Sequence, residues 1–198
     1  MNIAVYCGSN PESAETFMDT ARRLGTWIGQ SGNALVYGGS SIGLMGAVSH
    51  ATLQAGGEVY GVEPAFFIEA GVAQHDLTEL IVVETMTERR LKMIELADVF
   101  VALPGGVGTL EEISEIMSRI RLKMSPAPCF FLNQNGFYDG IIHLLDQMVQ
   151  ANFLDAQTQG EFLFPRSVDE LIDGLSRFVV QPKQLGDHPV VPETQTMG

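Results

Sequence analysis

Short apolar runs alternate with longer amphipathic segments along most of the chain, and this order predicts successive strand–helix–strand units. The apolar runs are rich in valine, tyrosine and phenylalanine. They predict strands at Ile3–Cys7, Ala34–Tyr37, Glu58–Val62, Leu80–Val83, Val99–Leu103 and Cys129–Leu132. The amphipathic segments predict helices near Glu12–Ser31, Leu44–Ala55, Met86–Ala97, Thr109–Lys123, Tyr138–Ala151 and Val168–Phe178. We therefore expect an α/β fold, with a doubly wound, Rossmann-like parallel sheet flanked by helices.

The pattern indicates a single domain over residues 1–180, without an internal repeat. Two segments lack a clear period. The stretch Pro64–Glu79 joins two strands and is expected to form a loop that is mobile or covers a ligand. After Phe178 the chain turns polar and contains three prolines, so residues 181–198 are expected to form a flexible tail.

The net charge of the chain disfavours some classes of binding partner. The net charge of -13 and the pI near 4.5 repel polyanions, which argues against a nucleic acid polymer or an anionic membrane as a partner. A small phosphorylated ligand stays compatible, because a local cationic pocket can overcome the global field. No apolar stretch reaches the ~18 residues of a membrane span, so a cytoplasmic location is expected.

Cysteine and histidine usage gives no sign of a metal. Cys7 and Cys129 both lie in apolar, strand-like runs, which favours reduced thiols buried in the core. The histidines are scattered through the chain, and neither residue type has metal-ligand spacing. We therefore expect no metal site.

Ligands of open parallel sheets collect at the carboxyl ends of strands, and three unusual loops follow such ends: Cys7–Glu12, Tyr37–Gly46 and Leu103–Glu112. The third loop is the most informative. Gly105, Gly106 and Gly108 let the backbone approach a ligand, and Thr109 is expected to open a helix. Free amides and the positive end of the helix dipole suit a phosphate there. The alternative is a tight turn with a threonine cap.

Helix geometry separates the acids that follow this loop. Ile113, Ile116 and Ile120 define an apolar stripe, and Glu112 falls at its border, whereas Glu111 points away. Glu112 is thus the partly buried carboxylate beside the predicted phosphate loop. The alternative is an acid that merely complements the helix dipole.

The segment Thr85–Met93 contains a second anomaly. Thr85 and Glu88 predict a capping box, and Arg89 and Arg90 follow at once. Positive charge in a first helical turn opposes the dipole, and Arg90 shares the stripe of the apolar positions, so an anion should lie nearby. The alternative is an ordinary ion pair with Glu88 or with a neighbouring element.

The second loop could be mistaken for a dinucleotide fingerprint. Its glycines do not have G-x-G-x-x-G spacing, and they follow the second predicted strand instead of the first. NAD binding is therefore disfavoured.

The motifs YGGSSIGLMG, MTERR and PGGVGTLEE, in this order and spacing, resemble the LOG (Lonely Guy) family, often misnamed lysine decarboxylases. The resemblance runs from Cys7 to Asp139. It implies a cytokinin riboside 5′-monophosphate phosphoribohydrolase that also accepts AMP, releases free base and ribose 5-phosphate, and needs no cofactor. It also implies a homodimer whose active site lies near the subunit interface.

The resemblance assigns Arg89 and Glu112 to the catalytic pair. The substrate and phosphate contacts that it implies, with the adjacent loop positions that we add as candidates, are Ser9, Gly39, Arg90, Gly105, Gly106, Val107, Gly108 and Thr109. Three positions depart from the family pattern: Ser40 replaces a glycine, MTERR replaces MHERK, and a tryptophan after the glycine motif is missing. These departures leave the choice between adenine and a prenylated adenine open.

Cleavage of such a bond passes through an oxocarbenium-like transition state, which a carboxylate such as Glu112 stabilises. Three other functions stay open from the sequence: a non-catalytic nucleotide or cofactor carrier, a pyridoxal-phosphate decarboxylase and an NAD oxidoreductase. The lysines Lys92, Lys123 and Lys183 fall on helices or in the tail, which disfavours the decarboxylase.

Overall fold

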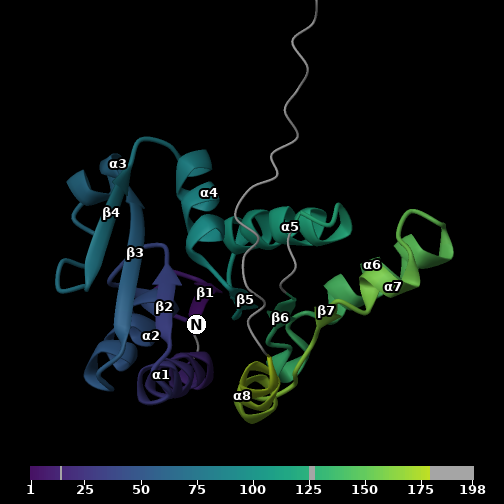
Figure 1. Cartoon of the computed structure of the whole chain (residues 1–198), viewed down its shortest axis with the longest axis horizontal. Helices are drawn as coiled ribbons and strands as arrows, with labels where there is room; N and C mark the ends of the chain where they lie inside the picture. The colour runs from purple at the N-terminus through teal and green to yellow at the C-terminus, as the bar shows by residue number, and fades with distance from the viewer. Residues whose placement is uncertain (14, 125–127, 179–198) are drawn as a thin grey trace, which may run out of the picture.

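A computed structural model describes residues 1–13, 15–124 and 128–178, and its centre is one parallel sheet (Figure 1). The seven strands lie in the order β4-β3-β2-β1-β5-β6-β7. Their bounds are Asn2–Tyr6 (β1), Ala34–Tyr37 (β2), Glu58–Pro64 (β3), Glu79–Val83 (β4), Val99–Ala102 (β5), Cys129–Phe131 (β6) and Phe162–Leu163 (β7). The chain winds outward from β1 in one direction and then returns to add β5 on the other side. The predicted doubly wound α/β fold is thereby confirmed.

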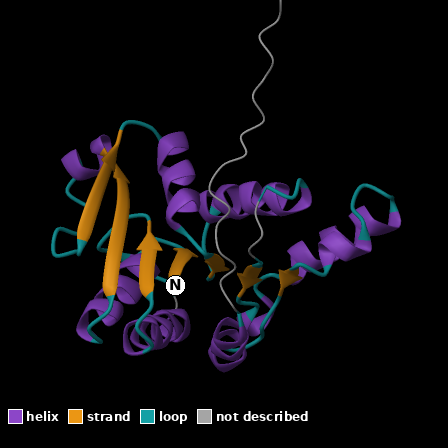
Figure 2. Cartoon of the chain, viewed as in Figure 1, coloured by secondary structure: helices purple, strands orange, loops and turns teal. Residues whose placement is uncertain are grey.

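Helices cover both faces of the sheet (Figure 2). Their bounds are Glu15–Gln30 (α1), Gly43–Gln54 (α2), Ala65–Glu69 (α3), Met86–Leu96 (α4), Val107–Arg121 (α5), Asp139–Gln150 (α6), Ala156–Gln159 (α7) and Val168–Arg177 (α8), with a 3₁₀ turn at Gln134–Gly136. Helices α1, α2 and α8 pack on one face, while α4, α5 and α6 pack on the other.

Each face has its own apolar core, because successive side chains of a strand point to opposite sides. In β1, Ile3 and Val5 join the core under α1 and α2, whereas Ala4 and Tyr6 join the core under α4 and α5. The strands of the sheet centre are buried on both sides, which explains their nearly continuous apolar sequence.

The two cysteines are both free and buried, as predicted, and they belong to different cores. Cys7 lies in the core of the α1 face and Cys129 in the core of the α5 face. The sheet separates the two thiols.

One predicted helix start differs in detail from the expectation, and another is confirmed. The α5 helix begins at Val107, with Gly106 as its N-cap and no side-chain cap, so Thr109 neither opens nor caps the helix. The capping box of α4 is present: the Glu88 amide donates to Thr85 Oγ1, and the Glu88 carboxylate accepts from the Glu84 amide.

Residues 64–79, expected to be a loop, contain α3 and an antiparallel bridge from Ser40 to Ala73. The bridge ties this segment to the loop after β2, together with hydrogen bonds from the Ser41 amide to Val72 and from the Gln74 amide to Gly39. The segment therefore folds over the carboxyl edge of the sheet. The tail predicted for residues 181–198 lies outside the described residues.

In the part of the chain that the structure describes, none of the helices is long and apolar enough to span a bilayer. Within the same residues, histidine, cysteine, aspartate and glutamate form no group that could hold a metal ion.

Candidate active site

A cavity of about 580 Å³ opens at the carboxyl edge of the sheet, where the order of the strands reverses between β1 and β5. Ligands of doubly wound folds bind at such a switch point, because the loops on its two sides diverge and leave a crevice. The cavity is lined by the loops after β1, β2 and β5, the end of β3, and parts of α3, α4 and α5.

The start of α5 forms one wall of this cavity through residues 106–109. Added Cβ atoms at Gly106 and Gly108 would meet open space, so the backbone there is uncovered. A Cβ at Gly105 would instead collide with Thr109. Because no side chain caps the helix and no acid lies in its first turn, the amides and the positive end of the dipole are available to an anion.

Arg89, on the first turn of α4, is the buried cation of the site, with an exposed fraction of 7%. Its Nε donates to the Val62 carbonyl at 3.2 Å, and its Nη2 donates to the Gly38 carbonyl at 3.1 Å. Both carbonyls lie near the carboxyl ends of neighbouring strands. A Cβ at Gly38 would collide with the guanidinium, so only glycine leaves room for this arrangement.

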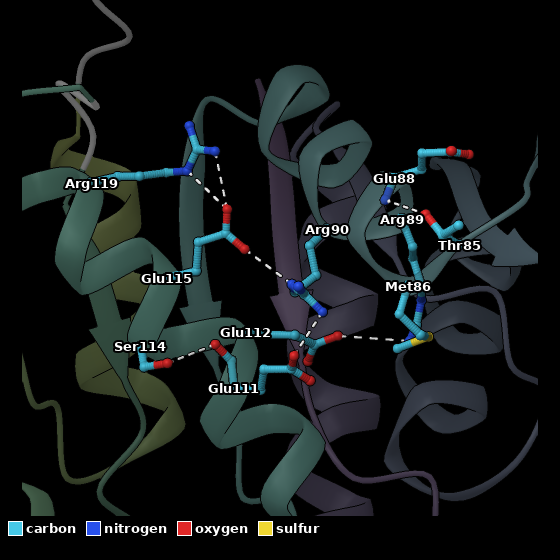
Figure 3. Close-up of polar contacts among 10 residues, drawn as sticks. All are labelled: Thr85, Met86, Glu88, Arg89, Arg90, Glu111, Glu112, Ser114, Glu115 and Arg119. Atoms are coloured by element: carbon cyan, nitrogen blue, oxygen red, sulfur yellow. Dashed lines mark hydrogen bonds and ion pairs between the residues drawn. The ribbon is translucent and has the colours of Figure 1, made fainter.

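Glu112 reaches the same cavity from the second turn of α5, and Figure 3 shows its carboxylate facing Arg89. Arg89 Nη1 lies 3.8 Å from Glu112 Oε1, which is an ion pair but too long for a direct hydrogen bond. Burial raises the pKa of Glu112 to about 7, and the Arg89 charge opposes this rise. The side chain can therefore exchange a proton near neutral pH.

Arg90 takes part in a different set of contacts, also visible in Figure 3. It pairs with Glu111 at 2.8 Å and with Glu115 at 3.0 Å, and Glu115 also binds Arg119. The Arg90 side chain is only 15% exposed, and the anions predicted near it are Glu111 and Glu115 of α5. Arg89 is nevertheless the more buried of the two arginines. The alternative expectation, ion pairs with a neighbouring element, describes Arg90 correctly.

The structure brings most of the predicted site residues together. Those that line the cavity are Ser9, Arg89, Glu112, Gly106, Val107, Gly108 and Thr109. Gly39, Gly105 and Arg90 lie outside this lining. Gly39 adopts φ +86°, a conformation that favours glycine, and the Glu63 carboxylate packs against it.

Sequence reasoning missed Glu63, Ser40 and Phe67, which line the cavity on the side of β2 and β3. Glu63 is 1% exposed and lies near the carboxyl end of β3, whose other acid, Glu58, is exposed at the start of the strand. An acid at that position of a buried strand was the signal that could have revealed it.

The fold and the cavity together define a doubly wound α/β protein whose site combines an uncapped helix start with a buried arginine and a facing glutamate. Residues 45–175 match the model of a family described as "Possible lysine decarboxylase". The chain is 38% identical to the cytokinin riboside 5′-monophosphate phosphoribohydrolase LOG of Oryza sativa subsp. japonica, covering 89% of this chain and 73% of that protein. It is 36% identical to the cytokinin riboside 5′-monophosphate phosphoribohydrolase of Rhodococcoides fascians, covering 86% of this chain and 87% of that protein.

The chain belongs to this family, which is the LOG family. A similar solved fold is the molybdenum cofactor binding protein of Rippkaea orientalis, with a TM-score of 0.65 and 22% identity over 88% of this chain and 94% of that one. This likeness supports the Rossmann-like architecture.

The family's description raises pyridoxal phosphate as a cofactor, and the lysines do not fit it. Such enzymes hold the cofactor as a Schiff base on a lysine. Among the described residues, no lysine lines the cavity: Lys92 pairs with Glu95, and Lys123 pairs with Glu161.

Proposed function

We propose that this protein hydrolyses the N-glycosidic bond of a nucleoside 5′-monophosphate and releases the free base and ribose 5-phosphate. The observation that carries the proposal is the buried pair of Arg89 and Glu112, held 3.8 Å apart in a cavity that also contains the open start of α5.

The 5′-phosphate binds at residues 106–109. The amides of that turn and the helix dipole hold an anion without a dedicated lysine. Because the phosphate is remote from the bond that breaks, its binding energy serves to place the anomeric carbon beside Glu112. Nucleosides without a phosphate are therefore expected to react poorly.

Glu112 acts on the anomeric carbon. Its carboxylate stabilises the positive charge that develops on the sugar, and it orients and deprotonates the attacking water. A pKa near 7 keeps a useful fraction of the carboxyl ionised at neutral pH and still lets it accept a proton. The gap of 3.8 Å to Arg89 means that no hydrogen bond between them has to break first.

Arg89 orients the reacting groups. Two backbone carbonyls fix its guanidinium, so its third nitrogen, Nη1, keeps a constant position facing Glu112. From there it stabilises charge on the departing base or holds the sugar. A flexible lysine would lack the planar fork that permits all these contacts at once.

The substrate that we propose carries adenine or an N6-prenylated adenine. The rice and Rhodococcoides relatives are named cytokinin riboside 5′-monophosphate phosphoribohydrolases, which supports the prenylated substrates, and AMP, the plain adenine counterpart, is included in the proposal. Phe67, Ala70 and Val72 give the β3 side of the cavity an apolar wall that suits a base.

A product assay across a panel of nucleoside monophosphates tests the function. Purified protein is mixed with AMP or isopentenyladenosine monophosphate, and free base is followed by chromatography. Glu112→Gln should abolish product, while Glu111→Gln, on the neighbouring and exposed residue, should not. Tight binding without product would instead indicate a carrier, and unchanged turnover in Glu112→Gln would refute the mechanism.

The assembly that we propose is a homodimer in the cytoplasm, as the family resemblance implies. Val107, which lines the cavity, and Leu110 of the same helix support a subunit contact, because these apolar residues are 86% and 47% exposed. Light scattering after size exclusion measures the mass, and a single-chain mass at micromolar concentration would contradict the dimer.

A further inference from the structure

Glu63 is a buried acid that lines the cavity, and the mechanism proposed above assigns it no role. It is the penultimate residue of β3, is 1% exposed and lines the cavity. Its Oε2 has no hydrogen-bond partner among the described residues. Leaving a buried polar atom unpaired costs about 1–3 kcal/mol, so a ligand that pairs with it would recover that energy.

The order of the strands places Glu63 opposite the phosphate loop. The loop follows β5, and the strands β1, β2 and β3 follow along the same edge of the sheet. Three strand spacings of ~4.8 Å separate β5 from β3 by roughly 14 Å. An extended nucleoside monophosphate with its phosphate on α5 therefore presents its sugar to Arg89 and Glu112, and its base to Glu63.

The charges around Glu63 favour a protonated carboxyl. Arg89 is the cation that acts on both Glu63 and Glu112, and it forms its ion pair with Glu112. One guanidinium compensates one carboxylate, so the second acid keeps its proton more readily. Burial raises the pKa of Glu63 to about 7, Arg89 opposes this rise, and Tyr37 is the other titratable group that interacts with it.

We propose that Glu63 binds the departing purine and donates its proton to ring nitrogen N7 as the base leaves. This inference rests on the proposed function and adds a general acid to it. N7 is present in adenine and in N6-prenylated adenine, so the role is the same for both. A purine that leaves with a proton departs more easily than an anion.

The step balances. The bond from C1′ to N9 breaks and its electron pair passes into the purine, while N7 takes the proton of the Glu63 carboxyl. A water oxygen bonds to C1′, and a proton of that water passes to the Glu112 carboxylate. Exchange with solvent then returns a proton to Glu63 and removes one from Glu112.

The test compares two leaving groups in wild type and Glu63→Gln, which keeps the shape of the side chain but cannot transfer a proton. AMP needs protonation of its base, whereas p-nitrophenyl β-ribofuranoside 5′-phosphate releases a stable anion. For AMP we expect kcat to fall by about 10²-fold, the usual size of general-acid catalysis. For the p-nitrophenyl substrate we expect a rate close to that of wild type. Glu69→Gln, on an exposed acid of α3, is the matched control.

Equal losses on both substrates would mean that Glu63 only supports the fold, and full activity on AMP would exclude it as an acid. Either result overturns the proposal. If wild type forms product from neither substrate, the proposed hydrolysis itself fails. Calorimetry with AMP and 7-deaza-AMP then tests recognition alone: a preference for AMP that Glu63→Gln abolishes supports contact with N7, and the absence of that preference in wild type overturns it.

Discussion

Replacing Glu112 with glutamine is expected to stop turnover and, at the same time, to weaken the dependence of folding stability on pH. Burial raises the pKa of this carboxyl from 4.5 to about 7. Below pH 4.5 the acid is protonated in both the folded and the unfolded chain, and it costs nothing. As the pH rises from 4.5 to 7, the unfolded chain ionises first, and the folded state is progressively destabilised.

The magnitude follows from the size of the shift. At ~1.4 kcal/mol per unit of pKa, the rise corresponds to about 3 kcal/mol once the pH exceeds 7. The Glu112 side chain is only 10% exposed, so solvent screens little of this cost. Most of it, about 2–3 kcal/mol, develops between pH 5 and pH 8.

Urea unfolding of wild type and Glu112→Gln at pH 5 and pH 8 measures the effect. The attraction between Arg89 and the ionised Glu112 carboxylate is already contained in the pKa of about 7, because the Arg89 charge opposes the rise, so the lost ion pair is not an additional contribution to the pH dependence. Between the two pH values, wild type should lose about 2–3 kcal/mol more of its unfolding free energy than the variant. Glu69→Gln, on an exposed acid of α3, should follow wild type. Parallel pH dependences of wild type and Glu112→Gln would refute the reasoning.

Three further predictions follow from the same contacts. Arg89→Lys should lower kcat/KM by about 10²-fold or more, because an ammonium group cannot bind both backbone carbonyls and also face Glu112. Steady-state kinetics measures this loss, and an unchanged circular dichroism spectrum shows that the variant is folded. Gly106→Ala should keep the fold, since its Cβ meets open space. The added methyl group should nevertheless keep the phosphate from the backbone amide and raise KM for the nucleotide by ~10–100-fold. Gly140→Ala, with equally open surroundings on α6, should leave KM unchanged. Cys129 should react with a thiol reagent only after unfolding, because its side chain is fully buried and lies outside the cavity lining, and rapid labelling of Cys129 in the native protein would contradict its placement.

Most strands and helices could be predicted from the sequence, because burial on one or two faces imposes a period on the residues. The strand Ala34–Tyr37 has the predicted bounds, and the other predicted strands differ by one or two residues at their ends. The two-residue strand β7 and the short helices α3 and α7 were missed, since a few residues cannot establish a period.

The site could be predicted only in part, because local sequence determines the position of some of its residues, whereas contacts distant in sequence determine the position of others. Glu112 follows from the apolar stripe of its own helix, and Ile113, Ile116 and Ile120 are indeed buried. Arg89 is buried because two distant carbonyls accept its hydrogen bonds, and nothing local to α4 reveals those partners. The apolar stripe of the helix therefore predicted Arg90, rather than Arg89, on its buried face. Glu63 was missed because the order of the strands, rather than its neighbours in sequence, brings it to the cavity.

The edge of the sheet where the strands begin lies opposite the cavity, and its turns can accept insertions. Among the described residues, the turns that lead into β2, β3 and β5 contribute none of the cavity lining. Gly32 and Gly56 adopt positive φ in the first two turns, so an insertion should keep both glycines, although the space around them is open. Peptide tags, reporter domains or new chain ends could be grafted at this rim while the chemistry at the far side of the sheet stays intact.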